Sequence, residues 1–416
     1  MRFFEVTGAP SGEDQAAWLA YAEWLTAAGD PRGEAIRLER AGGDRDRLAE
    51  VYAEVERYLG LDALRADGSW RFGWSGGFLE EAAFRLVPGD PSRRRALVAE
   101  LLTERPGGYP EDVDVDLDLE LSDPEQWEGV LIAAVLAHPV SHRLRELDLR
   151  LTDYHHSAER AATALAGATR PRLERLSFGY DFEYLFEHGK GSAGSRIDPM
   201  EHHGEGLVRT EIWGALPALR TLELEGAFLF AFVDHDGLTR LRTRGAVISD
   251  GSVFLPGRLP ALTSLELELE SDVFGVACSV DQLDELATTA DWYPHLRNLD
   301  LGRVEFDAGT SEVLAALAES PLLPRLEALT VRDLVIPEEE GGAVWLAALA
   351  PQFAHLVLRV AGAVEVEGVS EEEVGWVLPG LVGRTEGAGW QGPNGGWESG
   401  PVSDCHAQIG RDVTCG

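Results

Sequence analysis

The stretch LRELDLRL, residues 144–151, places leucine at alternate positions and polar residues between them. Such alternation is typical of a β-strand that is buried on one face only. The form L-x-x-L-x-[LFV] recurs in five further stretches: LERLSFGY (173–180), LRTLELEG (219–226), LTSLELEL (262–269), LRNLDLGR (296–303) and LEALTVRD (326–333). Where successive copies are clean, they start about 29 to 34 residues apart. A repeated unit therefore decides the fold.

Weaker copies of the strand pattern extend the array: FLEEAAFRL (78–86), DVDVDLDLEL (112–121), LTRLRTRG (238–245) and FAHLVLRV (353–360). Segments between the strands carry apolar residues at three- and four-residue spacing, which predicts helices over 93–105, 125–139, 157–168, 280–292, 311–320 and 343–353. Short loops rich in Pro and Gly precede several strands. The unit of helix, turn and strand predicts an α/β fold of stacked repeats.

The N-terminal region contains a tight corner, EWLTAAGDPRGEAIRLE, at residues 23–39. An amphipathic helix precedes it, and Gly29 stands where a left-handed helix cap is expected. Asp30 supplies an N-cap oxygen, and Pro31 takes the first helical position, where its missing N–H is not needed. We therefore expect two helices joined by a short turn.

These strand motifs resemble the leucine-rich repeat family, in the form with long repeats and outer helices, over roughly residues 75–375. The usual Asn after the strand is replaced by variable residues such as Asp153 and Gly226. The segment YAEWLTAAGDPRGEAIRLE resembles the repeat-companion domain at the N-terminus of many bacterial repeat proteins. The resemblance implies a horseshoe solenoid of parallel strands and outer helices, preceded by a small helical cap that shields the first repeat.

Three regions follow from this division: a helical cap or companion domain at 1–74, a solenoid at 75–383, and a C-terminal tail at 384–416 that is rich in Gly and Pro. A nucleotide-binding α/β enzyme would also alternate helices and strands. It would need a glycine-rich phosphate loop between a strand and a helix. The segment 179–195 follows a strand, but its GKGS lacks the first glycine at the required spacing, so this alternative is disfavoured.

The chain is strongly acidic, with 72 Asp and Glu against 36 Lys and Arg and a formal net charge of −36. Such a charge repels phosphate backbones and anionic membrane surfaces, so we expect no nucleic acid and no membrane partner. No apolar run reaches the length of a membrane span. The first residues lack an apolar signal-peptide core, and the chain has only three cysteines. We expect a cytoplasmic protein.

The residues between the repeat leucines are expected to face outward on a concave strand surface. The candidate partner-binding residues on this surface are Glu146, Asp148, Arg150, Glu223, Glu225, Arg240, Arg242, Arg244, Glu266, Glu268, Asp300 and Arg332. Arg240, Arg242 and Arg244 form a basic cluster between two acidic strands. One interpretation is neutralisation between neighbouring strands. The other is a mixed-charge docking site, where complementary charge selects the partner.

Histidines gather around a long loop, FEHGKGSAGSRIDPMEHHGEG, at residues 186–206. His188, His202 and His203 with nearby carboxylates have the donor types of a metal site, but their spacing matches no zinc pattern. No G-x-S-x-G elbow and no cysteine in a recognisable catalytic setting occurs. We therefore expect no enzymatic activity, no cofactor and no metal. Whether the 186–206 loop binds anything stays open.

The sequence thus predicts a non-catalytic scaffold that binds a protein or peptide on its strand surface. The acidic strands are compatible with a basic partner. The sequence does not indicate the oligomeric state. An alternative is a precursor whose tail is modified after translation, with the repeat body as a recognition leader. The tail residues that suggest this alternative are Trp390, Trp397, Ser403, Cys405, Thr414 and Cys415.

Overall fold

The computed structural model describes residues 10, 14–87, 89–104, 127–152, 158–189, 198, 208–226, 229–230, 233–246, 257–271, 277–378 and 380–382. The predicted strand at 112–121, most of the 186–206 loop and the tail at 384–416 lie outside these residues. Within the described part of the chain, no helix is both long and apolar enough to cross a membrane.

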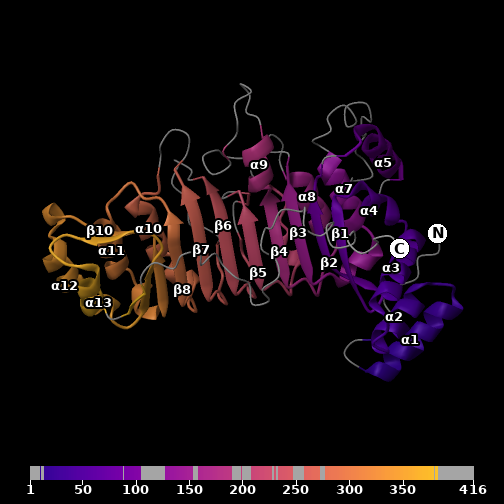
Figure 1. Ribbon diagram of the computed structural model, residues 1–416, viewed down its shortest axis with the longest axis horizontal. Coiled ribbons are helices and arrows are strands. Elements are labelled where there is room, and N and C mark those ends of the chain that lie inside the picture. The colour runs from indigo at the N-terminus through magenta and orange to yellow at the C-terminus, as the bar shows by residue number, and fades with distance from the viewer. Residues whose placement is uncertain are drawn as a thin grey trace, which may run out of the picture.

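An open, mostly parallel sheet of 11 strands dominates the α/β fold, and its strands follow one another in chain order (Figure 1). Its strands are β1 (Trp70–Ser75), β2 (Phe78–Arg85), β3 (Glu146–Leu151), β4 (Arg175–Tyr180), β5 (Thr221–Glu225), β6 (Arg240–Ala246), β7 (Ser264–Glu270), β8 (Asn298–Val304), β9 (Ala328–Val331), β11 (Val357–Val360) and β13 (Leu381–Val382). Among the strands that the structure describes, only β1 and β2 pair antiparallel. Near the C-terminal end, β10 (Leu334–Ile336) and β12 (Val364–Val366) form a second parallel pair.

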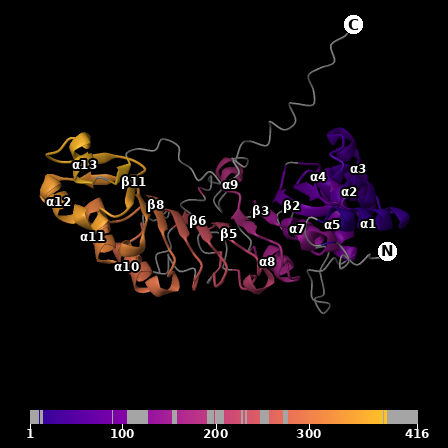
Figure 2. The ribbon, with the colours of Figure 1, turned by 90° about the horizontal axis from the view of Figure 1, so that it is seen from below.

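Helices occur between many of the strands. The α-helices of the repeats are α5 (Pro91–Glu104), α7 (Trp127–Leu136), α8 (Glu159–Ala166), α9 (Phe182–His188), α10 (Val280–Thr288), α11 (Thr310–Glu319), α12 (Gly342–Phe353) and α13 (Glu371–Val377). Of these, α8, α10 and α11 line one side of the sheet, whereas α9 lies away from that side (Figure 2). Short 3-10 turns are η3 (Pro139–Arg143), η4 (Trp213–Ala215), η5 (Ala290–Trp292), η6 (Leu323–Arg325) and η7 (Glu338–Glu340). All six helices predicted between the strands are present, which confirms an α/β fold of alternating helices and strands.

The alternation that predicts the strands is also seen in their burial. In β3, Leu147, Leu149 and Leu151 are buried, whereas the residues between them are partly exposed. The parallel register sets leucine beside leucine from β3 to β9, as in Leu222, Leu241 and Leu265. These side chains belong to one continuous apolar core that runs the length of the sheet. Figure 2 shows the row of strands bent into a shallow arc, with α8, α10 and α11 on its outer side.

The N-terminal helices are α1 (Gln15–Ala27), α2 (Arg32–Arg40), α3 (Arg45–Leu59) and α4 (Asp62–Asp67). Gly29 has a φ of +77°, and the Asp30 carboxylate accepts a hydrogen bond from the Arg32 amide at 3.0 Å. These contacts confirm the predicted corner between α1 and α2. The helices dock on the tip of the β1–β2 hairpin, where Phe78 packs against Trp18, Tyr21 and other apolar residues of α1 and α2.

Aromatic residues on β1 join these helices to the sheet. Trp74 stacks on Tyr52 of α3, with ring centroids 5.5 Å apart, and donates a hydrogen bond to Glu56 at 2.9 Å. Trp70 is buried in the core of the sheet, and Phe72 is packed between the two tryptophans. The predicted division at residues 74 and 75 falls inside β1, so this strand serves both the helical region and the sheet.

His138 is half-buried before η3 and makes stability depend on pH. Burial lowers its pKa to about 4, and its Nδ1 accepts a hydrogen bond from the Val140 amide at 3.2 Å. A histidine whose folded pKa lies below the unfolded value of about 6.5 binds its proton more readily when unfolded, so stability falls as pH falls below 6.5. Between pH 7.5 and 5.5 we expect the wild type to lose about 1.4 kcal/mol through this group.

Urea denaturation at the two pH values measures this loss, with His138→Asn as the reference. Asn supplies a side-chain oxygen for the same cap but does not titrate. Other titrating groups contribute equally to both proteins, so the difference between their pH dependences isolates His138. Equal pH dependence in the two proteins would contradict the prediction.

Candidate functional site

The candidate site is the side of the sheet opposite α8, α10 and α11, which we call the strand face. Adjacent parallel strands bring its side chains into rows. The first row is Glu146, Arg175, Thr221, Arg240, Ser264 and Asn298. The second is Asp148, Ser177, Glu223, Arg242, Glu266, Asp300 and Thr330. The third is Arg150, Gly179, Glu225, Arg244, Glu268 and, after a bulge in β8, Arg303.

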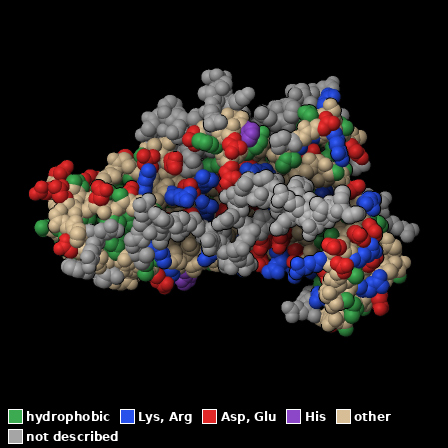
Figure 3. Space-filling view, viewed as in Figure 1, with side chains coloured by type: hydrophobic (Ala, Val, Ile, Leu, Met, Phe, Trp, Pro, Cys, Tyr) green, Lys and Arg blue, Asp and Glu red, His purple; other side chains and the backbone are tan. Residues whose placement is uncertain are grey.

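All the partner-binding residues predicted from the sequence lie in these rows except Arg332, which follows β9. Arg332 is half exposed and lies 3.9 Å from Glu305 and 3.7 Å from Asp333. Figure 3 shows acidic and basic side chains next to one another over the central strands. The fold therefore gathers residues that are up to about 190 positions apart in the chain.

One ion-pair network centres on Arg150 of β3, and we call it the Arg150 cluster. Its Nε lies 2.7 Å from Asp148, Nη2 lies 3.9 Å from Glu223, and Nη1 contacts Glu225. Burial alone would lower the pKa of Arg150, but the charges of Glu225 and Asp148 outweigh it and raise this pKa. Burial raises the pKa of Glu223 above its usual value, although Arg150 and Arg242 oppose the shift. Three carboxylates share one guanidinium here.

Gly179 of β4 allows this network to form. Arg150 and Glu225 flank Gly179 in register on the neighbouring strands, so the arginine must reach across β4 to meet its partner. A glycine leaves the path clear because it has no side chain. Its φ of +149° lies in a region that other residues rarely enter.

In a second network, three arginines surround one carboxylate, that of Glu268 of β7. We call it the Glu268 cluster. Its carboxylate lies 2.8 Å from Arg242 Nη2, 3.1 Å from Arg244 Nε and 2.9 Å from Arg303 Nη1. Burial would raise the pKa of Glu268, but the charges of Arg244, Arg303 and Arg242 outweigh it and lower this pKa. The Glu268 side chain is only 5% exposed, whereas that of Arg303 is 57% exposed.

Arg242 and Arg244 make further contacts that fix their positions. Arg242 Nε lies 3.0 Å from Glu266, as an ion pair without a hydrogen bond from that nitrogen. The guanidinium of Arg244 lies over the Phe182 ring, 5.2 Å from its centroid. Two of the three arginines of β6 thus neutralise glutamates of β7, as the first sequence interpretation proposes. Glu268 lies beneath the guanidinium groups, so a partner would meet the arginines first.

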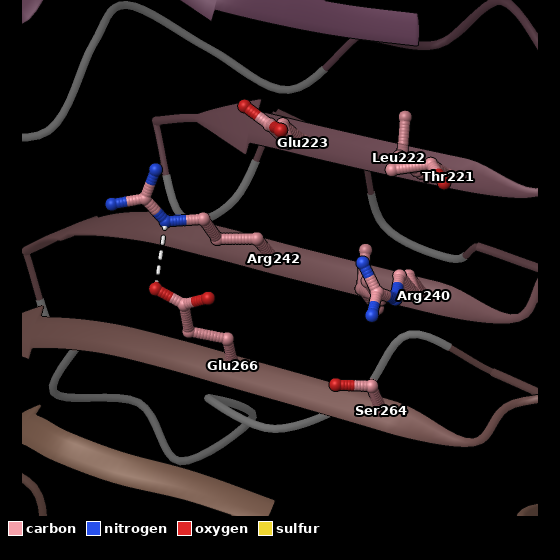
Figure 4. A pocket seen from close by; sticks show the side chains of 8 residues that line it. Thr221, Leu222, Glu223, Arg240, Arg242, Ser264 and Glu266 are labelled. Carbon is pink, nitrogen blue, oxygen red and sulfur yellow. Dashed lines mark ion pairs between the residues drawn. The ribbon is translucent and has the colours of Figure 1, made fainter. Parts of the chain in front are cut away.

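A shallow depression opens on the strand face between β5, β6 and β7 (Figure 4). It is open to solvent and its own volume is only about 10 Å³. Its lining is Thr221, Leu222, Glu223, Arg240, Leu241, Arg242, Ser264 and Glu266. Figure 4 shows Arg240 between Thr221 and Ser264, with the Arg242–Glu266 ion pair toward the other end of the strands.

His188 and His235 contact neighbouring residues of the fold. The ring of His188 stacks on Tyr184 with centroids 4.7 Å apart, and buried His235 accepts a hydrogen bond from Gly237 at 3.0 Å. His202 and His203 lie outside the described residues, as do all six tail residues of the precursor hypothesis. Among the described residues, no group of three His, Cys, Asp or Glu side chains is arranged to hold a metal ion.

Three residues of the site were not predicted from the sequence. Arg303 joins the Glu268 cluster because a bulge shifts the register of β8 after Asp300. Gly179 occupies a position of the strand face at which the neighbouring strands have side chains. The glycine in LERLSFGY is the signal that could have indicated this gap. Arg85 of β2 pairs with Asp181 at the start of α9, and no local pattern relates these two positions.

No known protein family matches the chain, and no curated protein matches it either. Among solved structures, the chain is similar to the crystal structure of a protein from Bacteroides fragilis that was a structural genomics target. The two share 17% sequence identity and a TM-score of 0.43, over 73% of this chain and 85% of that chain. This degree of similarity assigns neither a family nor a function.

Proposed function

We propose that the chain is a leucine-rich repeat protein with an N-terminal companion domain, and that it binds a protein or peptide on its strand face. One observation carries the proposal. From β3 to β8, three in-register rows of mostly charged side chains line one side of the sheet, while the repeat leucines are buried beneath them. A wide, pre-formed and charged surface suits a macromolecular partner, because complementary charge directs its orientation and association rate.

The charge distribution adds a second reason. Asp148, Glu223 and Glu225 share Arg150, so the Arg150 cluster carries an excess of negative charge that would favour a partner's basic group. The net charge of −36 would also steer a basic protein toward the molecule over distances of about 10 Å at ordinary salt. No step of this proposal requires catalysis or a cofactor.

Charge reversal on the strand face should weaken binding. The variant Glu146→Lys/Arg303→Glu/Arg332→Glu changes three exposed or half-exposed residues of this side and should reduce capture of a native partner at least about tenfold, since like-charge contacts cost several kcal/mol. The measurement is quantitative co-purification from the native host with the tagged full-length protein.

A matched control makes the same charge changes away from the strand face. Glu312→Lys/Arg93→Glu/Arg95→Glu alters exposed residues of α11 and α5 and should keep capture within about twofold of the wild type. A third protein that lacks residues 384–416 should also retain the partner. Equal capture by the strand-face variant and the control variant would contradict the proposal, and loss on truncation would favour a role for the tail.

A further inference from the structure

The charges of the strand face are divided unevenly along the sheet. Over β3–β5 the three rows hold four carboxylates and two arginines: Glu146, Asp148, Glu223, Glu225, Arg150 and Arg175. Over β6–β8 the same rows hold four arginines and three carboxylates: Arg240, Arg242, Arg244, Arg303, Glu266, Glu268 and Asp300. The strand face therefore has an acidic half over β3–β5 and a basic half over β6–β8.

Ion pairs within the acidic half do not remove its excess charge. Glu146 lies 3.7 Å from Arg175, so these two charges offset each other. The other three carboxylates of the acidic half all share Arg150, and Glu223 is only 3.9 Å close to it, compared with 2.7 Å for Asp148. One guanidinium offsets one of three carboxylates, so a basic group of a partner is favoured here.

In the basic half, burial conceals the shared carboxylate and not the guanidinium groups. The side chain of Glu268 is 5% exposed, whereas those of Arg242 and Arg244 are 25% and 26% exposed and that of Arg303 is 57% exposed. A partner would meet these three arginines before it meets Glu268. An acidic group of the partner is therefore favoured over β6–β8.

The spacing of the two halves limits the partner further. The Arg150 cluster is centred on β4 and β5, and the Glu268 cluster is centred on β7. Neighbouring strands lie about 4.8 Å apart, so the two centres are about 10–14 Å apart across the sheet. In an extended segment, residues four positions apart span about 13 Å and face the same side. A short extended segment can therefore reach both clusters with side chains on one face.

We propose that the strand face binds a bipolar segment of the partner, which crosses the strands with basic side chains over β3–β5 and acidic side chains over β6–β8. This inference rests on the proposed function and specifies the charge pattern of its ligand. The opposite placement would set like charges against each other in both halves, so the pattern fixes the orientation of the segment. Glu270 lies one step beyond the rows on β7 with Arg332 near it, which confines the basic half to the rows themselves.

Two octapeptides of identical composition test the inference by fluorescence anisotropy with the full-length protein. One has two Lys followed by two Glu, and the other alternates Lys with Glu; glycine separates the charged residues in both, and both carry the same uncharged fluorophore. Their net charge is equal, so attraction by the acidic chain as a whole does not distinguish them. The block peptide should bind at least about threefold more tightly than the alternating peptide.

Variants of each half then assign the contacts. Glu223→Gln in the acidic half and Arg303→Gln in the basic half should each weaken the block peptide about two- to fivefold. Replacing both Glu of the peptide with Gln should remove the effect of Arg303→Gln but keep that of Glu223→Gln, and replacing both Lys should do the reverse. The matched controls Glu54→Gln and Arg57→Gln make the same charge changes at exposed positions of α3 and should change affinity by less than about 1.5-fold.

Three outcomes would overturn this inference: no binding of the block peptide to the wild type, equal affinity for the two peptides, or effects of the variants that do not depend on the peptide's charges. Far-UV circular dichroism and thermal melting confirm that each variant is folded, and Asp148→Asn replaces Glu223→Gln if that protein does not fold.

Capture of the native partner separates this inference from the proposed function. If the strand-face variant loses the partner but Glu223→Gln/Arg303→Gln captures it as well as the wild type does, the proposed function stands and this inference is wrong. If both proteins retain the partner, the proposed function itself is wrong.

Discussion

Gly179→Ala is expected to lower the free energy of unfolding by about 3–5 kcal/mol, a loss at the upper end for single substitutions. A Cβ at this position would lie 2.0 Å from the carbonyl oxygen of Glu225 and 2.7 Å from its amide nitrogen. These are backbone atoms of the neighbouring strand, so they cannot rotate away as a side chain would. The φ of +149° adds strain of about 1–3 kcal/mol for any residue with a side chain. Urea denaturation measures the loss.

Two controls separate this clash from a general effect of replacing glycine. Gly214→Ala meets no atom within 4 Å and has no positive φ, so its stability should remain within about 0.5 kcal/mol of the wild type. Arg150→Gln should cost less energy in the Gly179→Ala background than in the wild type, because a widened β4–β5 gap already separates Arg150 from Glu225. A Gly179→Ala protein within 1 kcal/mol of the wild type would contradict the prediction.

Local periodicity is sufficient to predict β2 to β9, β11 and most helices, but not β1 or the short strands β10, β12 and β13. Each of the six clear repeat strands has apolar residues two positions apart, as at Leu147 and Leu149, and this pattern depends on nothing outside the segment. Even the weak copy at 238–245 corresponds to a strand, β6. The turn between α1 and α2 was predictable for the same reason, since Gly29 and Asp30 act within a few residues of their positions.

The site was predictable only as a set of positions on one side of the sheet. Which charges pair depends on neighbours about 24 to 75 residues away, as for Arg242 with Glu266 and for Arg150 with Glu225. Strand spacing and register decide those pairs, and a single sequence does not state either. Three arginines surround and bury Glu268, and the bulge in β8 brings one of them, Arg303, within reach. The depression at Arg240 likewise exists only once β5 and β7 are aligned with β6.

Arg170→Met should also destabilise the fold strongly, by about 3–5 kcal/mol, as expected when the donor of three buried hydrogen bonds is removed. Arg170 is completely buried after α8. Its Nη1 donates to the carbonyl oxygens of Leu165 and, at 2.7 Å, Ala168, and its Nη2 donates to that of Leu136 at 2.8 Å. One guanidinium therefore caps the C-terminal ends of α7 and α8, where a positive charge is favourable.

Arg170 stays charged although it is completely buried, because the ordinary pKa of a guanidinium is so high. Burial lowers its pKa to about 10, which still leaves it protonated at neutral pH. Met would fill a similar volume but would remove a donor from carbonyl groups of both helix ends, although the Leu136 carbonyl would keep the hydrogen bond from the Ser141 hydroxyl. Arg170→Lys keeps a charge and three donors, so it should recover part of the stability lost by Met. The exposed Arg57→Met should change the free energy of unfolding by less than about 0.5 kcal/mol. If Arg170→Lys lowered the free energy of unfolding as much as Arg170→Met, the shape of the arginine side chain and not its donated charge would account for its stabilising effect. The capping role would then be wrong.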